Sequence, residues 1–220
     1  MKLTISDLFD LDHTMAKDYL RQFTYPWEAL AGIGDMILSL GAALSEDEYD
    51  RPEEGVWVAR DAKVYPTAYL GAPCIIDHGA ELRHCAFVRG SAIVGKHAVV
   101  GNSCELKNVV LFDNVQTPHF NYVGDSILGY KAHMGAGSIT SNVKSDKTLV
   151  VVKNGAEHIE TGRKKFGAIL GDYVEVGCNS VLNPGTVVGR HSNIYPVSCV
   201  RGVIPESSIL KSTGEVVRKV

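Results

Sequence analysis

The chain has 220 residues, of which 45% are hydrophobic and 21% charged, and its formal net charge is −3. This composition is typical of a folded globular protein and excludes the high-charge, low-hydrophobicity class of disordered chains. The slightly acidic balance supplies no positive field for a phosphate polymer, so we expect no nucleic-acid partner. No apolar run reaches the roughly 18 to 20 residues that span a bilayer, and the N-terminus lacks a secretory pattern. We therefore expect a cytoplasmic protein with no membrane partner.

Residues 1–54 are predicted to form a helical cap. A threonine precedes Tyr25-Pro26-Trp27-Glu28, which is typical of a helix start with proline in the first turn. Apolar residues with helical spacing follow at Leu30, Ile33, Ile37 and Leu40. We interpret this segment as two helices that cover the open end of the structure that follows, where backbone groups would otherwise lack partners.

From Val58 onward, a large aliphatic residue recurs every six positions. The positions are Val58, Val64, Leu70, Ile76, Leu82, Val88, Val94, Val100 and Leu106. Four residues after each stands a residue that is nearly always small, such as Ala62 or Cys74. A period of six fits neither a helix nor a long alternating strand. It fits a short strand followed by a corner, and three such units close a triangular coil of about 18 residues that buries its core against neighbouring coils.

The period returns after two interruptions, at residues 128–134 and again at 170–194. We therefore place an all-β domain, a parallel β-helix of hexapeptide repeats, at residues 55–210 and a C-terminal tail at 211–220. A glycine follows the large residue in many units, at Gly71, Gly95, Gly101, Gly129, Gly135, Gly171, Gly177 and Gly189. We expect these glycines at corners that need unusual backbone angles.

An insertion at residues 143–166 breaks the repeat. Two strand-like runs, 148–153 and 156–161, flank Asn154-Gly155, which is a strong hairpin signal. The hairpin should project from the prism. It ends in Arg163-Lys164-Lys165, a basic cluster that is either a solvated surface or an anion site.

Arg89 and Lys107 are separated by one full coil of the repeat, so we expect their side chains to stack about 4.8 Å apart. Two adjacent cations favour the binding of an anion between them. A phosphate suits both, because arginine offers a planar fork of donors and lysine a point charge. The alternative is a pair of solvated surface cations.

His119 follows the second break in the repeat, at residues 108–118. A histidine that a rigid loop holds beside an anion site can act as a general base near neutral pH. The alternative is a surface histidine that is merely hydrogen-bonded. The sequence contains no His-x-x-x-His pair and no carboxylate cluster that suggests zinc, so we expect no metal.

Two stretches, HFNYVGDS (119–126) and MGAGSITSN (134–142), resemble the acetyltransferase domain of the bifunctional glucosamine-1-phosphate acetyltransferase/N-acetylglucosamine-1-phosphate uridyltransferase family. The resemblance is closer still to the archaeal-type sugar-1-phosphate nucleotidylyltransferases, which carry a similar hairpin before the motif TGRKKFGAI (161–169). It covers about residues 55–205. It implies a left-handed β-helix that forms a homotrimer, with sites between neighbouring subunits.

By position, the resemblance implies that His119 is the catalytic base and Glu105 a possible orienting acid. The residues that hold the sugar phosphate are then Arg89, Lys107, Tyr122 and Lys165. This sequence departs from the family pattern at two positions, both of which bear on the identity of the sugar. His133 stands where the bacterial enzymes have an asparagine that contacts the sugar, and Val143 replaces a tyrosine.

The resemblance also implies a coenzyme groove for acetyl-CoA, which serves as co-substrate. Ala136, Cys178 and Pro196 line this groove. Asn142, a further candidate catalytic residue, lies at the junction of sugar and coenzyme. Cys178 has no histidine partner in the sequence, so we interpret it as a lining residue and not as a nucleophile.

The function implied is an acetyl-CoA-dependent N-acetyltransferase that acts on an amino-sugar 1-phosphate such as glucosamine 1-phosphate, in UDP-N-acetylglucosamine biosynthesis. Residues 1–54 are too few for a nucleotidylyltransferase domain, so we expect no uridylyl transfer. Two alternatives stay open. One is a catalytically silent module that binds a sugar phosphate or serves assembly. The other is a gamma-type carbonic anhydrase, although His78 and His84 do not have that family's spacing.

Overall fold

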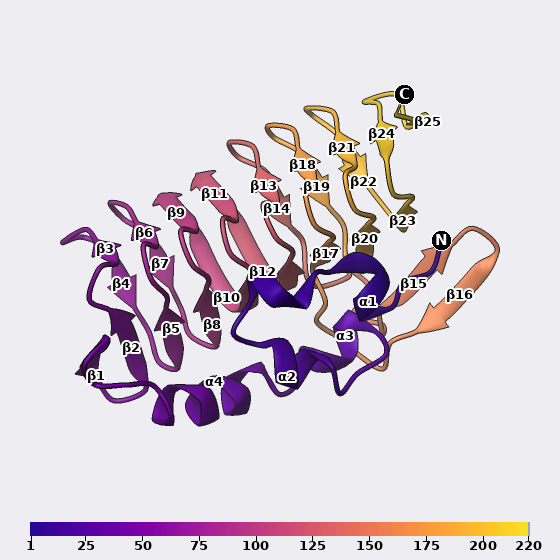
Figure 1. Cartoon of the computed structure of the whole chain (residues 1–220). Coiled ribbons are helices and arrows are strands. Elements are labelled where there is room, and N and C mark those ends of the chain that lie inside the picture. Colours follow the sequence, from indigo (N-terminus) through magenta and orange to yellow (C-terminus); the bar gives the residue numbers. More distant parts are fainter. Residues whose placement is uncertain (220) are drawn as a thin grey trace.

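The computed structural model describes residues 1–219 and shows a prism of stacked coils (Figure 1). Three short strand segments complete each coil, and each pairs in parallel with the segment one coil further along. Glu81 lies opposite Val99, for example, and Phe87 lies opposite Glu105. The predicted fold, an all-β, left-handed parallel β-helix of hexapeptide repeats, is confirmed.

The prism has three faces. The helix-covered face contains β2 (Val56–Ala59), β5 (Cys74–Ile76), β8 (Ala92–Val94), β17 (Ala168–Leu170), β20 (Thr186–Val188) and β23 (Val203–Ile204). The β11 face contains β3 (Lys63–Val64), β6 (Glu81–Leu82), β9 (Val99–Asn102), β11 (Gln116–His119), β13 (His133–Met134), β18 (Glu175–Val176), β21 (Asn193–Ile194) and β24 (Ser208–Leu210). The β7 face contains β4 (Tyr69–Leu70), β7 (Phe87–Val88), β14 (Ile139–Thr140), β19 (Val181–Leu182) and β22 (Cys199–Val200). Two longer strands, β10 (Glu105–Leu111) and β12 (Tyr122–Leu128), begin on the β7 face and end on the helix-covered face.

The large aliphatic residues of the repeat fill the interior. Leu82, Val88, Val94, Val100 and Leu106 are all fully buried. Each is stacked on its counterpart in the next coil, so the core is a set of aliphatic columns that run along the prism.

The expectation for the repeat glycines is wrong. Within residues 1–219, positive φ angles occur instead three residues after the large aliphatic, for example at Cys85 and His97. The glycines serve close packing between coils. A Cβ at Gly101 would lie 1.5 Å from the carbonyl oxygen of Pro118, and one at Gly177 would lie 2.4 Å from the nitrogen of Pro196.

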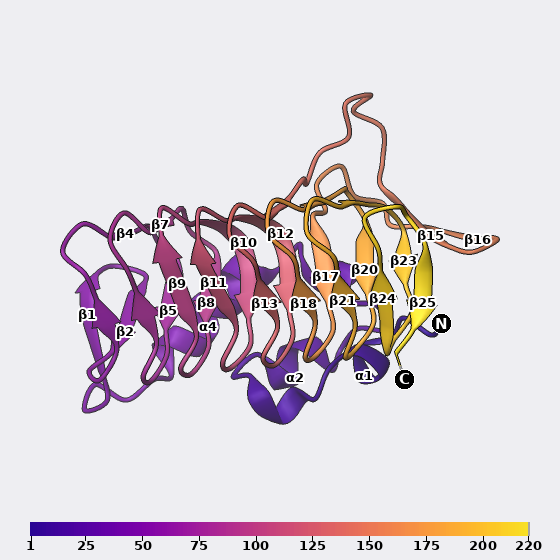
Figure 2. The same ribbon diagram turned by 90° about the horizontal axis from the view of Figure 1, so that it is seen from above.

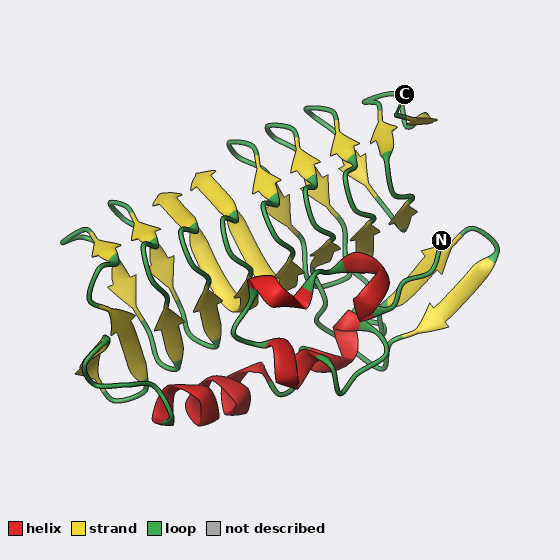
Figure 3. Cartoon of the chain, viewed as in Figure 1, coloured by secondary structure: helices red, strands yellow, loops and turns green. Residues whose placement is uncertain are grey.

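The N-terminal helices lie along one side of the prism rather than over its first coil (Figures 1 and 3). They are α1 (Ile5–Leu8), the 3₁₀ helix η1 (Leu11–His13), α2 (Lys17–Leu20), α3 (Pro26–Ala29) and α4 (Ile33–Ala42). The amide of Asp172 donates to the carbonyl of Leu8 at 3.1 Å, and Asn108 Nδ2 donates to the carbonyl of Leu30 at 3.1 Å. The segment thus runs from the last coils towards the first. At the first coil, β1 (Tyr49–Glu53) pairs antiparallel with β2.

An apolar outer surface explains this path. On the helix-covered face, six of the residues that point away from the interior are fully buried aliphatics: Ile75, Ile93, Val110, Ile127, Ile169 and Val187. The helices cover this row with their own apolar residues, among them Leu20, Leu30 and Ile37. Removing both apolar surfaces from water stabilises the arrangement.

The insertion forms the predicted hairpin, with β15 (Val151–Asn154) paired to β16 (Glu157–Glu160). Its base is packed against the last coils, because Val150 and Val152 are fully buried, and its tip extends beyond the prism (Figure 2). Residues 211–219 return along the last coil, where β25 (Val216–Arg218) pairs antiparallel with β24. Among residues 1–219, no helix combines the length and the apolar character that crossing a membrane requires.

We predict that Ile93→Ala lowers the free energy of unfolding by about 2 to 5 kcal/mol, because Ile93 is fully buried and β8 packs against α4. Urea denaturation measures this change. Ser39→Ala, at an exposed position of α4, is the control and should change stability by no more than about 0.5 kcal/mol. Equal small effects at both positions would contradict the packing described above.

Candidate functional site

Arg89 and Lys107 lie on adjacent coils at the end of the β7 face, where the Arg89 amide donates to the carbonyl of Leu106 at 2.9 Å. We call this cation pair the clamp. Each member has a carboxylate partner in the chain. Arg89 Nη1 lies 2.8 Å from Glu105 Oε1, and Lys107 Nζ lies 2.9 Å from Asp125 Oδ1. Glu105, the possible orienting acid of the sequence analysis, is therefore paired with Arg89.

The clamp lies where the coils become shorter. Glu81 pairs with Val99 and Phe87 with Glu105, both 18 residues apart, whereas Glu105 pairs with Tyr122 at a spacing of 17. The shorter coil turns from the β7 face to the helix-covered face through a tight corner, with positive φ at Asn108 and Asp125. The break expected at residues 108–118 is thus a one-residue shortening, and β10 and β11 continue through most of it.

Asp125 is the residue at this corner that the sequence analysis missed. Its side chain is 3% exposed and accepts hydrogen bonds from Lys107 and from the side-chain amides of Asn108 and Asn142. Asn108, Asp125 and Asn142 are each 17 residues apart, which is the spacing of the shortened coil. This 17-residue spacing could have identified Asp125 from the sequence, but only with the knowledge that the coil is one residue shorter here.

Tyr122 and Asn142 complete this cluster. Asn142 Nδ2 donates to the Tyr122 hydroxyl at 3.2 Å. Burial and the negative charge of Asp125 raise the pKa of Tyr122 above its usual value, so the phenol keeps its proton. Lys165 is exposed at the end of the insertion, and its backbone bridges Val143, the residue next to Asn142.

His119 lies at the opposite end of the β7 face, at the corner where β11 ends. Its side chain is exposed, and Asn121 fixes its backbone. Asn121 Oδ1 accepts from the His119 amide at 3.1 Å, and its Nδ2 donates to the carbonyls of Gly135 and Ser138. Asn121 is 2% exposed, and the sequence analysis did not single it out.

The corner of His119 is in line with three of the predicted coenzyme residues. The carbonyls of His119, Ala136 and Cys178 each accept a backbone hydrogen bond from the corner of the next coil, at 3.0, 2.8 and 2.9 Å. His119, Ala136, Cys178 and Pro196 therefore occupy equivalent places on successive coils. We call these four residues the corner row.

A shallow groove of about 300 Å³ lies on the β11 face and reaches the corner row at Cys178 and Pro196. Cys178, Tyr195 and Pro196 line one part of it, and His133 and Glu175 line another. His133 Nδ1 lies 2.7 Å from Glu175 Oε2. His133 is thus on the β11 face with the predicted coenzyme residues, and within one chain the structure does not bring it to the clamp.

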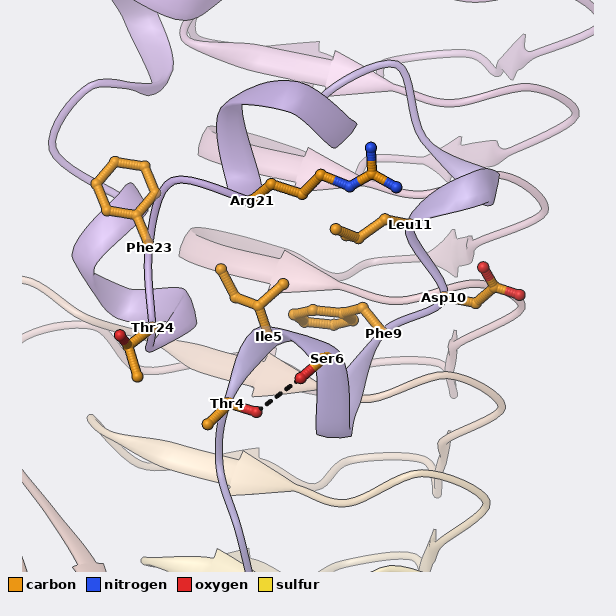
Figure 4. Close-up of a pocket in the computed structure, with 9 residues that line it drawn as sticks. All are labelled: Thr4, Ile5, Ser6, Phe9, Asp10, Leu11, Arg21, Phe23 and Thr24. Carbon is orange, nitrogen blue, oxygen red and sulfur yellow. Dashed lines mark hydrogen bonds between the residues drawn. The ribbon is translucent and has the colours of Figure 1, made fainter.

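A larger hollow, of about 470 Å³, lies within the N-terminal segment (Figure 4). Ile5, Phe9 and Leu11 form its apolar part, and Arg21 reaches across it. None of the predicted site residues lines it. Among residues 1–219, no three His, Cys, Asp or Glu side chains come close enough together to hold a metal ion.

The comparisons with known proteins agree with the resemblance found in the sequence. The GMPPB C-terminal domain family matches residues 72–194. A bifunctional sugar-1-phosphate nucleotidylyltransferase/acetyltransferase of Sulfurisphaera tokodaii is 28% identical over 218 residues, covering 90% of this chain and 54% of that protein. A bifunctional protein GlmU of Methanococcus maripaludis is 30% identical over 207 residues, covering 92% and 50%. The chain thus spans about half the length of these curated relatives.

Among solved structures, the polySia specific acetyltransferase NeuO has a TM-score of 0.52 at 13% identity. The match covers 76% of this chain and 88% of NeuO. At that identity the likeness shows a shared fold.

Proposed function

This chain belongs to the GMPPB C-terminal domain family, and we propose that it is an acetyl-CoA-dependent N-acetyltransferase acting on an amino-sugar 1-phosphate such as glucosamine 1-phosphate. The observation that carries the proposal is that the corner row and the clamp lie at the two ends of the β7 face. His119 begins the corner row at one end of the β7 face, and β12 runs from Tyr122 to the other end. There Asn108, Asp125 and Asn142 meet Lys107, and we call this place the clamp corner. The printed names of the curated relatives, which include acetyltransferase, support the same activity.

His119 acts as the general base in this proposal. The amine of a 2-amino sugar is mostly protonated at neutral pH, so a base must take its proton before or during attack on the thioester. The nitrogen then forms a bond to the acetyl carbon while the carbon–sulfur bond of acetyl-CoA breaks. The ammonium group loses two protons in all: one leaves to solvent, and the other passes through the imidazole to the CoA thiolate. No covalent intermediate with the protein is needed, and much of the acceleration comes from holding the two substrates together.

The clamp holds the phosphate. Its two cations and their two carboxylates carry no net charge together, so the phosphate binds through donors that the carboxylates leave free. The Lys107 side chain is 27% exposed and the Arg89 side chain 48%, so both reach solvent. Lys165 brings a further positive charge from the end of the insertion.

Acetyl-CoA extends along the corner row in this proposal. From His119 to Pro196 the row spans three coil spacings, or about 14 Å. An extended pantetheine arm follows that line, with the thioester beside His119 and the arm passing Ala136 and Cys178.

A silent module that binds a sugar phosphate is the second candidate. The observation that favours it is that each cation of the clamp already has a carboxylate partner in the chain. Incubation with acetyl-CoA and a panel of amino-sugar 1-phosphates, with free CoA thiol as the readout, separates the two functions. A silent module binds the sugar phosphate and releases no thiol.

We predict a homotrimer, measured by light scattering at micromolar concentration. The N-terminal segment occupies the helix-covered face, so subunits meet through the other two faces. Exposed apolar side chains lie there, at Phe120 and Val197 beside the corner row and at Tyr69 on the β7 face. Only a neighbouring subunit can bring His133 to the clamp. A stable monomer at that concentration contradicts this assembly.

We predict that His119→Ala lowers kcat by about 10²- to 10⁴-fold, the usual range for loss of a general base. The melting temperature and the oligomeric state should stay close to those of the parent protein, because the side chain is exposed. Thiol release and thermal denaturation measure the two effects. Near-normal turnover would refute the assignment of His119.

We predict that Arg89→Ala and Lys107→Ala each raise KM for the sugar 1-phosphate and leave KM for acetyl-CoA nearly unchanged. Each substitution removes a charge-assisted hydrogen bond worth about 1.5 to 3 kcal/mol. The unphosphorylated amino sugar is the control, since it has no phosphate to hold, and the variants should use it about as poorly as the parent does. Equal losses for both sugars would show that the clamp does not bind phosphate.

A further inference from the structure

The buried carboxylate of Asp125 is the centre of the clamp corner. It accepts from Lys107 Nζ at 2.9 and 3.2 Å and from Asn108 Nδ2 at 2.9 Å. It also accepts from Asn142 Nδ2 at 2.5 Å. An ionised carboxylate can only accept hydrogen bonds, so the part of the Asn142 amide that faces Asp125 is fixed as the nitrogen.

The fixed orientation of the Asn142 amide also determines the direction of its hydrogen bond with Tyr122. The second N–H of the Asn142 amide donates to the Tyr122 hydroxyl, so both of its donors are used inside the protein. In the part of the chain that the structure describes, no hydrogen bond reaches Asn142 Oδ1. The Tyr122 oxygen accepts the bond from Asn142, which leaves the hydroxyl proton of Tyr122 available to a ligand.

Gly124 keeps the space in which this bond forms. A Cβ at this position would lie 2.4 Å from the Tyr122 hydroxyl oxygen and 3.0 Å from Asn142 Nδ2. The φ of Gly124 is not positive, so the backbone conformation does not demand glycine there. The close approach of Tyr122 and Asn142 is what excludes a side chain.

We propose that Asp125 is a positioning residue that fixes the direction of the hydrogen bonds offered to the acceptor sugar. Through Asn142 it presents an oxygen, which accepts from the amine or a hydroxyl of the sugar. Through Tyr122 it presents a proton, which is donated to a phosphate oxygen beside Lys107. This inference rests on the proposed function, because it assigns a sugar phosphate to the β7 face.

The first test is Asp125→Asn, which keeps the shape of the side chain but lets the group at 125 donate as well as accept. We expect KM for glucosamine 1-phosphate to rise by about tenfold or more and KM for acetyl-CoA to change by less than about twofold. Asp172→Asn is the matched control. Asp172 is also a fully buried carboxylate paired with a cation, Arg190 at 3.0 Å, but it lies beneath the N-terminal segment. Identical kinetics of the two variants, or equal changes in both KM values of Asp125→Asn, would overturn the proposal.

The second test is the double variant Asp125→Asn with Asn142→Asp, which keeps composition and net charge but reverses the direction of the network. The carboxylate at 142 then accepts from the Tyr122 hydroxyl and turns its proton away from the ligand. We expect KM for glucosamine 1-phosphate to stay raised. Restoration of the parent KM would show that Asp125 contributes only charge or volume, and would overturn the proposal.

A calorimetric titration with N-acetylglucosamine 1-phosphate measures binding without acetyl transfer, so it tests this inference separately from the proposed function. If the parent protein binds this sugar phosphate but releases no thiol, the proposed transfer fails, and the direction of the network is then judged from affinity. Asp125→Asn and the double variant should each bind about tenfold or more weakly than the parent and than Asp172→Asn. A parent protein that neither transfers acetyl nor binds the sugar phosphate would overturn both.

Discussion

Parallel hydrogen bonding between successive coils is the constraint on which the rest of this structure depends. It holds residues one coil apart in contact, whether the coil has 18 residues, as from Glu81 to Val99, or 17, as from Glu105 to Tyr122. A residue can be removed only at a corner, because the strands must stay in register for the aliphatic columns to remain continuous. The missing residue tightens the corner at Asn108 and Asp125. The side chains of the clamp corner meet because of this tightening.

The fold was predictable from the sequence because every inward residue of a solenoid meets the same environment. The aliphatic residues from Val58 to Leu106 therefore repeat visibly, and so do the small residues four positions later. The path of the N-terminal segment was not predicted, because the six-residue repeat describes only the residues that point into the prism. The signal for that path lies in outward positions: Ile75 and Ile93 stand 18 residues apart on the helix-covered face and are apolar, whereas Glu81, an outward position of the β11 face, is charged.

The candidate site was predictable only in part. The 18-residue spacing places Arg89 beside Lys107, and the resemblance adds Tyr122 and Asn142, which do lie together. The carboxylate partners could not be derived, because side-chain pairing depends on the geometry of the shortened corner. The pairing of Glu105 with Arg89 is one example. His133 falls on a different face, which a linear motif cannot show.

Under the proposed function, the carboxylates beside the clamp also affect which ligands the site selects. Two unpaired cations on a surface attract any phosphate, since the attraction is almost independent of the rest of the ligand. With Glu105 and Asp125 in place, the local charge is balanced, and a phosphate alone gains little by binding. A ligand that also fills the acceptor at Asn142 and the donor at Tyr122 gains several directed hydrogen bonds at once. Specificity is a difference between affinities, so a clamp that weakens the binding of simple phosphates can favour the ligand that satisfies the whole corner.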